Sequence, residues 1–168
     1  MAGVYRPRHP ERSVLYRVLF HYFDRFLAEY ETLLLDVPHR QVVFTIPKML
    51  RIFFKYNRRL LGELGRSALR SLTRYFEVVT GSELMPGVIA AIQTFGNRIN
   101  ARPHLHFLVT EGGVDKAGLF HKIPRLDDSR LAELFAREVL GFLVRKELLS
   151  PEWADRRGRF FTAVCFPT

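Results

Sequence analysis

The predicted fold depends on one stretch, Pro103-His104-Leu105-His106-Phe107-Leu108-Val109-Thr110-Glu111-Gly112-Gly113. Its apolar run, bounded by a proline and two glycines, predicts a β-strand. Residues two apart in a strand point to the same face, so His104 and His106 should project together. Leu105, Phe107 and Val109 should then pack on the opposite face. Two adjacent imidazoles on one face are half of a divalent-metal site, although a His-x-His pair also arises by chance.

A second strand is predicted just before the histidine strand, over residues 88–95. Its nearly continuous apolar character predicts a central place in the sheet. A hairpin between 88–95 and 104–110 would put the Gln93 side chain beside the two histidines. A Gln inside an apolar strand needs partners for its amide. Gln93 is therefore either a backbone-bonded core residue or a third metal ligand through its amide oxygen, with His121 as the next candidate ligand.

Apolar residues recur at helical spacing in three other regions of the chain. One helix is expected over about 11–31. A second helical region runs from about 47 to 79, where Gly62 and Gly65 are expected to divide it. A third helix should begin at the cap offered by Asp127-Asp128-Ser129.

The remaining sequence adds strands and a tail. A strand is expected at 41–46, and the glycines at 112, 113 and 118 predict a hairpin towards His121. The fold class is therefore α+β, with a central antiparallel sheet and packed helices. Residues 1–155 are expected to form the domain, and 156–168 an aperiodic tail.

Composition limits the kinds of protein that this chain can be. Its 168 residues suffice for one compact domain, and 48% of them are apolar. The single cysteine, Cys165, excludes an internal disulfide framework and a cysteine-rich zinc site. No apolar run is long enough to span a bilayer, and the charged residues 1–10 are unlike a signal peptide, so we expect a cytoplasmic protein without a membrane partner. The sequence does not predict an oligomeric state.

The formal charge of +9 predicts a polyanionic partner, with nucleic acid ahead of an anionic membrane. The alternative is a basic but inert surface. Eight cations at spacings of three, four or seven residues would lie on one stripe of roughly 40 Å if the 47–79 region were one unbroken helix. Because few acids oppose them, the stripe is predicted to contact DNA phosphates. They are Lys48, Arg51, Lys55, Arg58, Arg59, Arg66, Arg70 and Arg74.

Several motifs, taken in order, resemble one family. The His-x-His strand with its Gly-Gly end is similar to the motif of the rolling-circle insertion-sequence transposases, a paired-tyrosine family within the HUH nuclease superfamily. Other segments also resemble that family: the N-terminal opening 5–11, the V-P-H-R-Q-V-V-F-T-I-P segment 37–47, the Q-T-F-G motif 93–96 and the helix 142–155.

The resemblance implies a mechanism. A divalent metal, Mg²⁺ or Mn²⁺, would be held by His104, His106 and a third ligand, and would polarise the scissile phosphate of single-stranded DNA. A tyrosine would attack that phosphate, form a 5′-phosphotyrosine link and free a 3′-hydroxyl. The expected function is thus DNA binding and nicking in DNA transposition.

Two departures from the family set the alternatives. The family's cysteine-rich zinc module is missing, and the family's nucleophilic tyrosine follows the histidine motif, whereas all six tyrosines here precede it. We therefore expect a copy shortened before its nucleophile, whose status as an enzyme stays open. A permuted, tyrosine-first order would make Tyr5 or Tyr16 the nucleophile. The alternatives are a non-catalytic DNA-binding remnant and, less favoured, an unrelated His-x-His metallohydrolase.

Overall fold

The computed structural model describes residues 37–95, 101–123, 125–155 and 161–167. Its contacts divide the chain into two units, residues 1–37 and residues 38–168, and the fold below is that of the second. The predicted helix at 11–31 lies outside the described residues, as do Tyr5 and Tyr16. Within the described ranges, no helix combines the length and apolar character needed to cross a membrane.

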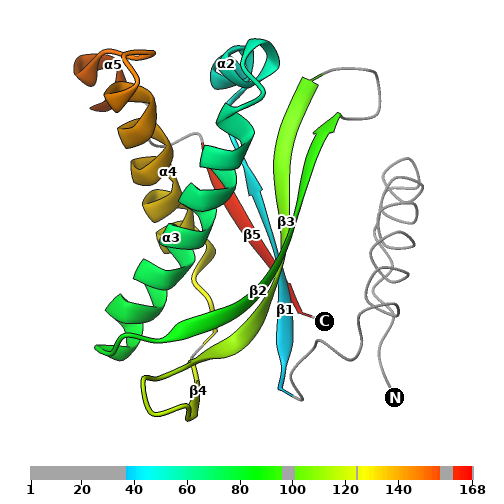
Figure 1. The fold of residues 1–168 in the computed structure, drawn as a ribbon, viewed down its shortest axis with the longest axis vertical. Coiled ribbons are helices and arrows are strands. Elements are labelled where there is room, and N and C mark those ends of the chain that lie inside the picture. The colour runs from blue at the N-terminus through cyan, green and yellow to red at the C-terminus, as the bar shows by residue number, and fades with distance from the viewer. Residues whose placement is uncertain (1–36, 96–100, 124, 156–160, 168) are drawn as a thin grey trace. The chain divides into compact units, whose positions relative to one another are not determined.

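The second unit is built on an antiparallel five-stranded sheet (Figure 1). Its strand order is β2-β3-β1-β5, and β4 pairs separately with β3. The strand bounds are β1 His39–Thr45, β2 Met85–Phe95, β3 Ala101–Val114, β4 Phe120–Lys122 and β5 Thr162–Pro167. The predicted strand near 41–46 and the predicted histidine strand are confirmed. The predicted hairpin between the histidine strand and the strand before it is confirmed as well.

The helices lie on one face of this sheet, where α3 and α4 run side by side (Figure 1). Asp127 caps α4 as predicted, because its carboxylate accepts hydrogen bonds from the backbone N–H groups of Ser129 and Arg130. Gly81 ends α3 in the left-handed conformation, with a φ of 69°. The helix bounds are η2 Lys48–Leu50, α2 Arg51–Tyr56, α3 Leu60–Thr80, α4 Asp128–Arg145 and α5 Pro151–Asp155. The α+β class with an antiparallel sheet and packed helices is confirmed.

The core lies between the sheet and the α3–α4 layer. Leu105, Phe107 and Val109 are fully buried on the helix-covered face, as the strand periodicity predicted. Phe44 of β1 links the layers, since its ring lies 5.4 Å from that of Phe107 and 4.8 Å from that of Phe135 on α4, between centroids. Aromatic pairs in this distance range stabilise a core beyond their buried area. The alternate residues of β3, which include both histidines, therefore face away from the core.

Strand β2 is at the edge of the sheet, so the prediction of a central strand is wrong. Its apolar character comes partly from Ala90 and Ala91, which are small and remain exposed. A run of apolar letters does not distinguish such residues from a strand buried on both faces.

The division of the second helical region lies at residues 57–59, before the two glycines that were expected to mark it. The Asn57 backbone is extended, and its side-chain oxygen accepts a hydrogen bond from the Arg59 N–H at 3.2 Å. Asn favours this local arrangement over a continuing helix. Gly62 and Gly65 lie inside α3, and a Cβ at Gly65 would be 3.9 Å from Cδ1 of Ile92 in the sheet, an ordinary contact distance.

The prediction of an aperiodic tail is wrong for residues 162–167, which form β5 and pair with β1. Phe161 and Ala163 are buried, whereas Thr162 and Val164 are exposed. The alternation of period two was present in the sequence. It was missed because Ala163 is a small inward residue and Val164 an apolar outward one.

Candidate metal centre and nucleic-acid interface

The two histidines lie together on β3, on the face of the sheet opposite α3 and α4. His104 pairs with Thr45 of β1 and His106 with Val43, so both belong to the middle of the sheet rather than to an edge. Their ring centroids are 5.0 Å apart and their planes are inclined at 66°. Both side chains are half-buried. The strand therefore places both histidine side chains on one face of the sheet, as predicted.

Gln93 lies directly opposite His104 in the β2–β3 pairing. Opposed residues of an antiparallel pair project to the same face, so the amide and the two imidazoles share one surface. Gln93 is half-buried, and no hydrogen bond to its amide occurs within the part of the chain that the structure describes. That geometry fits a third donor better than a backbone-bonded core residue.

A backbone carbonyl fixes the tautomer of His104. Its Nδ1 lies 2.7 Å from the carbonyl oxygen of Arg102. A carbonyl only accepts, so Nδ1 carries the proton and donates. In the neutral ring this leaves the lone pair on Nε2, the atom that then faces a ligand. Metal-binding histidines in proteins are oriented by the same kind of hydrogen bond.

His106 has a polar partner on one ring nitrogen and none on the other. Its Nδ1 lies 3.2 Å from the side-chain amide of Gln41, whereas its Nε2 is buried and has no hydrogen-bond partner among the described residues. A half-turn of the Gln41 amide brings the amide oxygen to Nδ1. The oxygen would then accept from Nδ1–H and free the Nε2 lone pair. Buried polar atoms in proteins are rarely unpaired, so a ligand is the natural partner for Nε2.

Electrostatics favours the neutral ring at His106. Burial, and then the nearby His104, lower the pKa of His106 to about 4. The imidazole is therefore uncharged at neutral pH, which is the form that binds a metal.

Two imidazole nitrogens and an amide oxygen make a mixed donor set that fits a divalent ion with an oxygen-rich remainder of its shell. Within the described ranges, no group of three His, Cys, Asp or Glu side chains could hold a metal, so the third donor among those residues would be the Gln93 amide. His121 does not supply it. It pairs with Gly113, nine residues along β3 from His104 and thus roughly 30 Å away at 3.3 Å per residue. Its Nε2 lies 2.6 Å from an Asp115 carboxylate oxygen.

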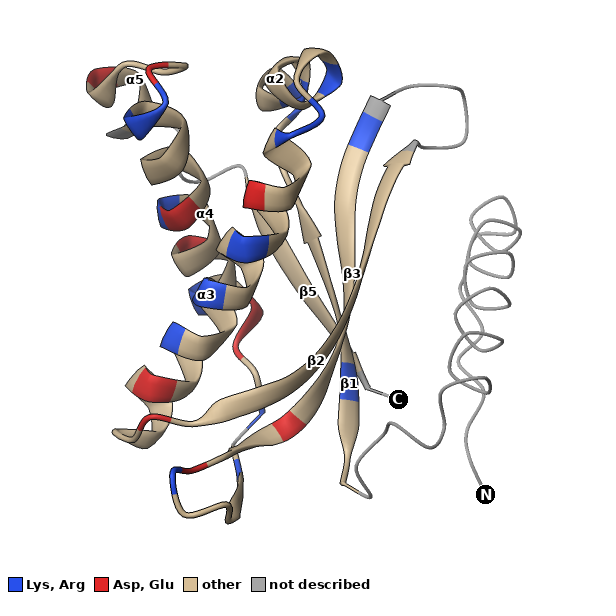
Figure 2. Cartoon of the chain, in the orientation of Figure 1, with Lys and Arg blue, Asp and Glu red and all other residues tan. Residues whose placement is uncertain are grey.

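The predicted basic stripe is divided in two by the 57–59 break (Figure 2). Three arginines of α3 are paired with acids: Arg66 with Glu63 at 2.9 Å, Arg70 with Glu138 at 2.6 Å and Arg74 with Glu77 at 2.9 Å. Glu138 lies on α4, and a reading of α3 alone did not identify it as an opposing charge. These three arginines have less free charge to offer a phosphate.

The other five cations of the stripe have no acidic partner among the described residues. They are Lys48, Arg51, Lys55, Arg58 and Arg59. Arg51 is the most constrained of them. Its Nε is buried and has no hydrogen-bond partner among the described residues, and burial, followed by the charge of Arg102, lowers the pKa of Arg51. Positive charge without a local counter-charge is therefore concentrated on η2, α2 and the following turn.

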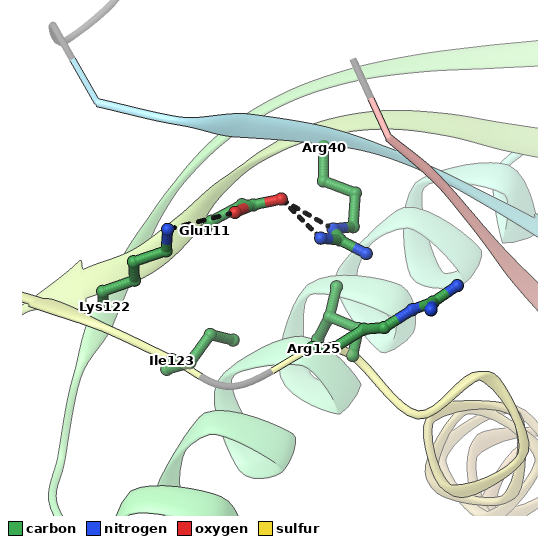
Figure 3. A pocket seen from close by; sticks show the side chains of 6 residues that line it. Arg40, Glu111, Lys122, Ile123 and Arg125 are labelled. Atoms are coloured by element: carbon green, nitrogen blue, oxygen red, sulfur yellow. Dashed lines mark hydrogen bonds and ion pairs between the residues drawn. The ribbon is translucent and has the colours of Figure 1, made fainter.

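A second polar cluster lies at the opposite end of β3, around a hollow of about 360 Å³. Figure 3 shows Glu111 between Arg40 and Lys122, with Arg125 nearby. Arg40 donates to one Glu111 oxygen through both Nε, at 3.1 Å, and Nη2, while Lys122 Nζ lies 3.9 Å from the other. The sequence analysis did not single out this cluster, because its members are far apart in the chain and form no motif.

The two described tyrosines differ sharply in exposure. Tyr75 is buried in α3, and its hydroxyl accepts a hydrogen bond from the Asp127 N–H at 2.8 Å, so it has a structural role. Tyr56 ends α2 and is 76% exposed.

Comparisons with known proteins find similar sequences that span the histidine strand. A family model described as "Putative transposase" matches residues 87–154, which include both histidines and Gln93. The transposase for insertion sequence element IS801 of Pseudomonas savastanoi pv. phaseolicola is 38% identical over 104 residues. Over part of its length, the chain is therefore similar to an insertion-sequence transposase.

The match covers 59% of this chain and 25% of that relative, so the chain spans well under half the length of the protein it matches. No solved structure matches the chain significantly. The predicted resemblance to insertion-sequence transposases is confirmed, whereas the roles of individual residues stay predictions.

Proposed function

We propose that this chain is a DNA-binding and metal-binding domain that acts in DNA transposition, with single-stranded DNA as its partner. One observation carries the proposal: His104 and His106 share a face with Gln93, and the buried Nε2 of His106 has no hydrogen-bond partner within the part of the chain that the structure describes. The transposase relationship adds DNA as the substrate class. We propose Mg²⁺ or Mn²⁺ as the metal, because the donor set has no thiolate and leaves room for oxygen ligands.

Each group in the site has a physical task. A bound cation would supply Lewis-acid polarisation of a phosphodiester oxygen. The neutral imidazoles of His104 and His106 would hold this cation, and the Arg102 carbonyl and the Gln41 amide would fix the orientations of the two rings. The unpaired cations of η2 and α2 attract the DNA backbone.

The covalent step needs a nucleophile that these residues do not supply. In the family that the sequence resembles, a tyrosine after the histidine motif makes the phosphotyrosine link. Residues 107–168 contain no tyrosine. We therefore propose that this 168-residue chain binds the metal and the DNA, and that it does not carry out covalent strand transfer by itself.

Metal binding is tested by calorimetric titration of Mn²⁺ into the wild-type chain and single variants. His106→Ala and His104→Ala should each weaken binding by at least about tenfold, because each removes a direct ligand. Gln93→Ala should weaken it less, since water replaces a neutral amide oxygen. His121→Ala is the matched control and should bind as the wild type does. Equal affinities in the wild type and His106→Ala would refute the proposed site.

A non-catalytic DNA-binding remnant is the second candidate, favoured by the lack of a tyrosine after His106. The two candidates differ in slow hydrolytic cleavage of a labelled single-stranded oligonucleotide with Mn²⁺, which a bound metal allows without a covalent adduct. Slow cleavage that depends on His104 and His106 supports a nicking domain in which water attacks. DNA binding with no cleavage supports the remnant.

A further inference from the structure

The short helix α2 and the preceding η2 expose apolar side chains on one face. Met49 is 42% exposed, Ile52 55% and Tyr56 76%, and their spacing of three and four residues places them along one side. The neighbouring Leu50 and Phe54 are buried in the core, so the helix already has an inward apolar face. The outward apolar side chains of this short helix do not pack in the core, so they do not contribute to folding through burial.

Cations surround this apolar face, and acids do not. Lys55, Arg58 and Arg59 lie within three residues of Tyr56 in the sequence, and Lys48 begins η2. None of these four cations has an acidic partner among the described residues. Figure 2 shows the blue positions on α2 without red ones beside them. The Lys55 ammonium lies 5.5 Å from the centre of the Tyr56 ring. An exposed aromatic ring beside unpaired cations offers both a stacking surface and phosphate contacts.

The position of α2 relates it to the histidines. Thr45, the last residue of β1, pairs with His104, and the chain enters η2 three residues later. Helix α2 also contacts β3. Figure 1 shows α2 beside the end at which β3 begins. A DNA strand held at α2 would therefore lie at the same end of β3 as the histidines, whose side chains project from the opposite face of the sheet.

We propose that the Tyr56 ring stacks on an unpaired base of single-stranded DNA, while Lys55 and Arg59 contact the phosphates on either side of it. This inference rests on the proposed function and specifies which strand form the domain prefers. In a duplex both faces of a base are covered by its neighbours, so only a single strand offers a free face for the ring. The surrounding positive charge favours a nucleic acid over an apolar protein partner for this surface.

The test measures binding of a fluorescein-labelled single-stranded oligonucleotide by anisotropy, beside a duplex of the same sequence. Tyr56→Ala should weaken single-strand binding about fivefold to 150-fold, the range measured when one stacked base loses its aromatic partner. Duplex binding should be nearly unchanged. Tyr56→Phe should bind as the wild type does, because it keeps the ring. Met85→Ala is the matched control, since Met85 is equally exposed, at 76%, and lies on β2.

Salt dependence separates stacking from charge. Tyr56→Ala should leave the slope of log affinity against log salt unchanged, whereas Lys55→Gln should reduce it for both DNA forms. If the wild type binds DNA and Tyr56→Ala binds single strands equally well, stacking is refuted and the proposed function stands. Equal losses for single strands and duplex, or the same loss in Tyr56→Phe, would also refute stacking. If the wild type binds no DNA, the proposed function itself fails.

Discussion

Both ends of strand β3 carry polar side chains, but the two ends differ in whether these side chains have partners within the fold. At the Glu111 end, the carboxylate accepts two hydrogen bonds from Arg40 and lies near Lys122, so charges of opposite sign meet inside the protein. At the histidine end, His106 Nε2 and Arg51 Nε are buried, and neither atom has a hydrogen-bond partner in the described ranges. Both ends belong to one sheet and one continuous strand.

This difference leads us to expect a structural cluster at the Glu111 end and a binding site at the histidine end. A polar group that is satisfied within the fold contributes to stability, and its loss leaves a partner unpaired. A buried polar group that the fold leaves unpaired costs stability, and is retained where a ligand completes it. We therefore expect substitutions at the Glu111 end to change stability and those at the histidine end to change binding.

The largest expected effect concerns covalent DNA cleavage. The 168-residue chain should form no phosphotyrosine adduct, because a metal centre without its nucleophile loses the reaction rather than a fraction of it. Labelled single-stranded DNA and Mn²⁺ are incubated with the chain, and the products are separated by denaturing electrophoresis. An adduct that disappears in Tyr5→Phe or Tyr16→Phe would overturn this expectation and indicate a tyrosine-first order. An adduct that disappears in Tyr56→Phe would place the nucleophile on α2.

The next effect tests the Glu111 end. Glu111→Gln should lower the free energy of unfolding by about 1–3 kcal/mol, because Arg40 keeps only a neutral acceptor in a half-buried place. Urea denaturation monitored by circular dichroism measures this. Gln93→Ala at the histidine end is the control and should change stability by less than about 0.5 kcal/mol. Similar losses in both variants would contradict the division of roles between the two ends.

Much of the fold could be predicted because local patterns decided it. The alternation around Leu105 and Phe107 gave the histidine strand and its face, and Asp127 marked the start of α4. The edge position of β2 was not predictable in this way, because Ala90 and Ala91 suit a buried or an exposed strand equally. Strand β5 was missed because Ala163 and Val164 blur the alternation that tertiary pairing then uses.

In the candidate site, too, local patterns were predictable and contacts between distant residues were not. His104, His106 and Gln93 were predictable because a strand period and one hairpin place them together. Gln41 was not, since its contact with His106 joins residues 65 apart in the sequence. The pairing of Arg70 with Glu138 was hidden for the same reason, so sequence alone overestimated the free charge on α3.

The smallest expected effect compares two arginines of the predicted stripe. Arg58 is exposed and has no acidic partner among the described residues, whereas Arg74 is exposed and lies 2.9 Å from a Glu77 oxygen. The slope of log affinity against log salt is negative, and Arg58→Gln should reduce its magnitude for single-strand binding by about 0.7, the value for one lost phosphate contact. Arg74→Gln should leave the slope nearly unchanged, because Glu77 already offsets the charge that it removes.

The two variants remove the same charge from the same residue type, so any difference between them reports its surroundings. The slope is obtained by anisotropy titrations between about 50 and 200 mM salt, the range over which phosphate contacts change affinity measurably. Glu77→Gln provides the reciprocal check: freeing Arg74 from its partner should raise the slope if DNA passes along α3. An unchanged slope in Glu77→Gln with a reduced one in Arg58→Gln would confine the DNA path to the α2 end. If Arg58→Gln and Arg74→Gln reduce the slope equally, the DNA contacts cations on both α2 and α3. Local ion pairs would then not decide which cations bind DNA.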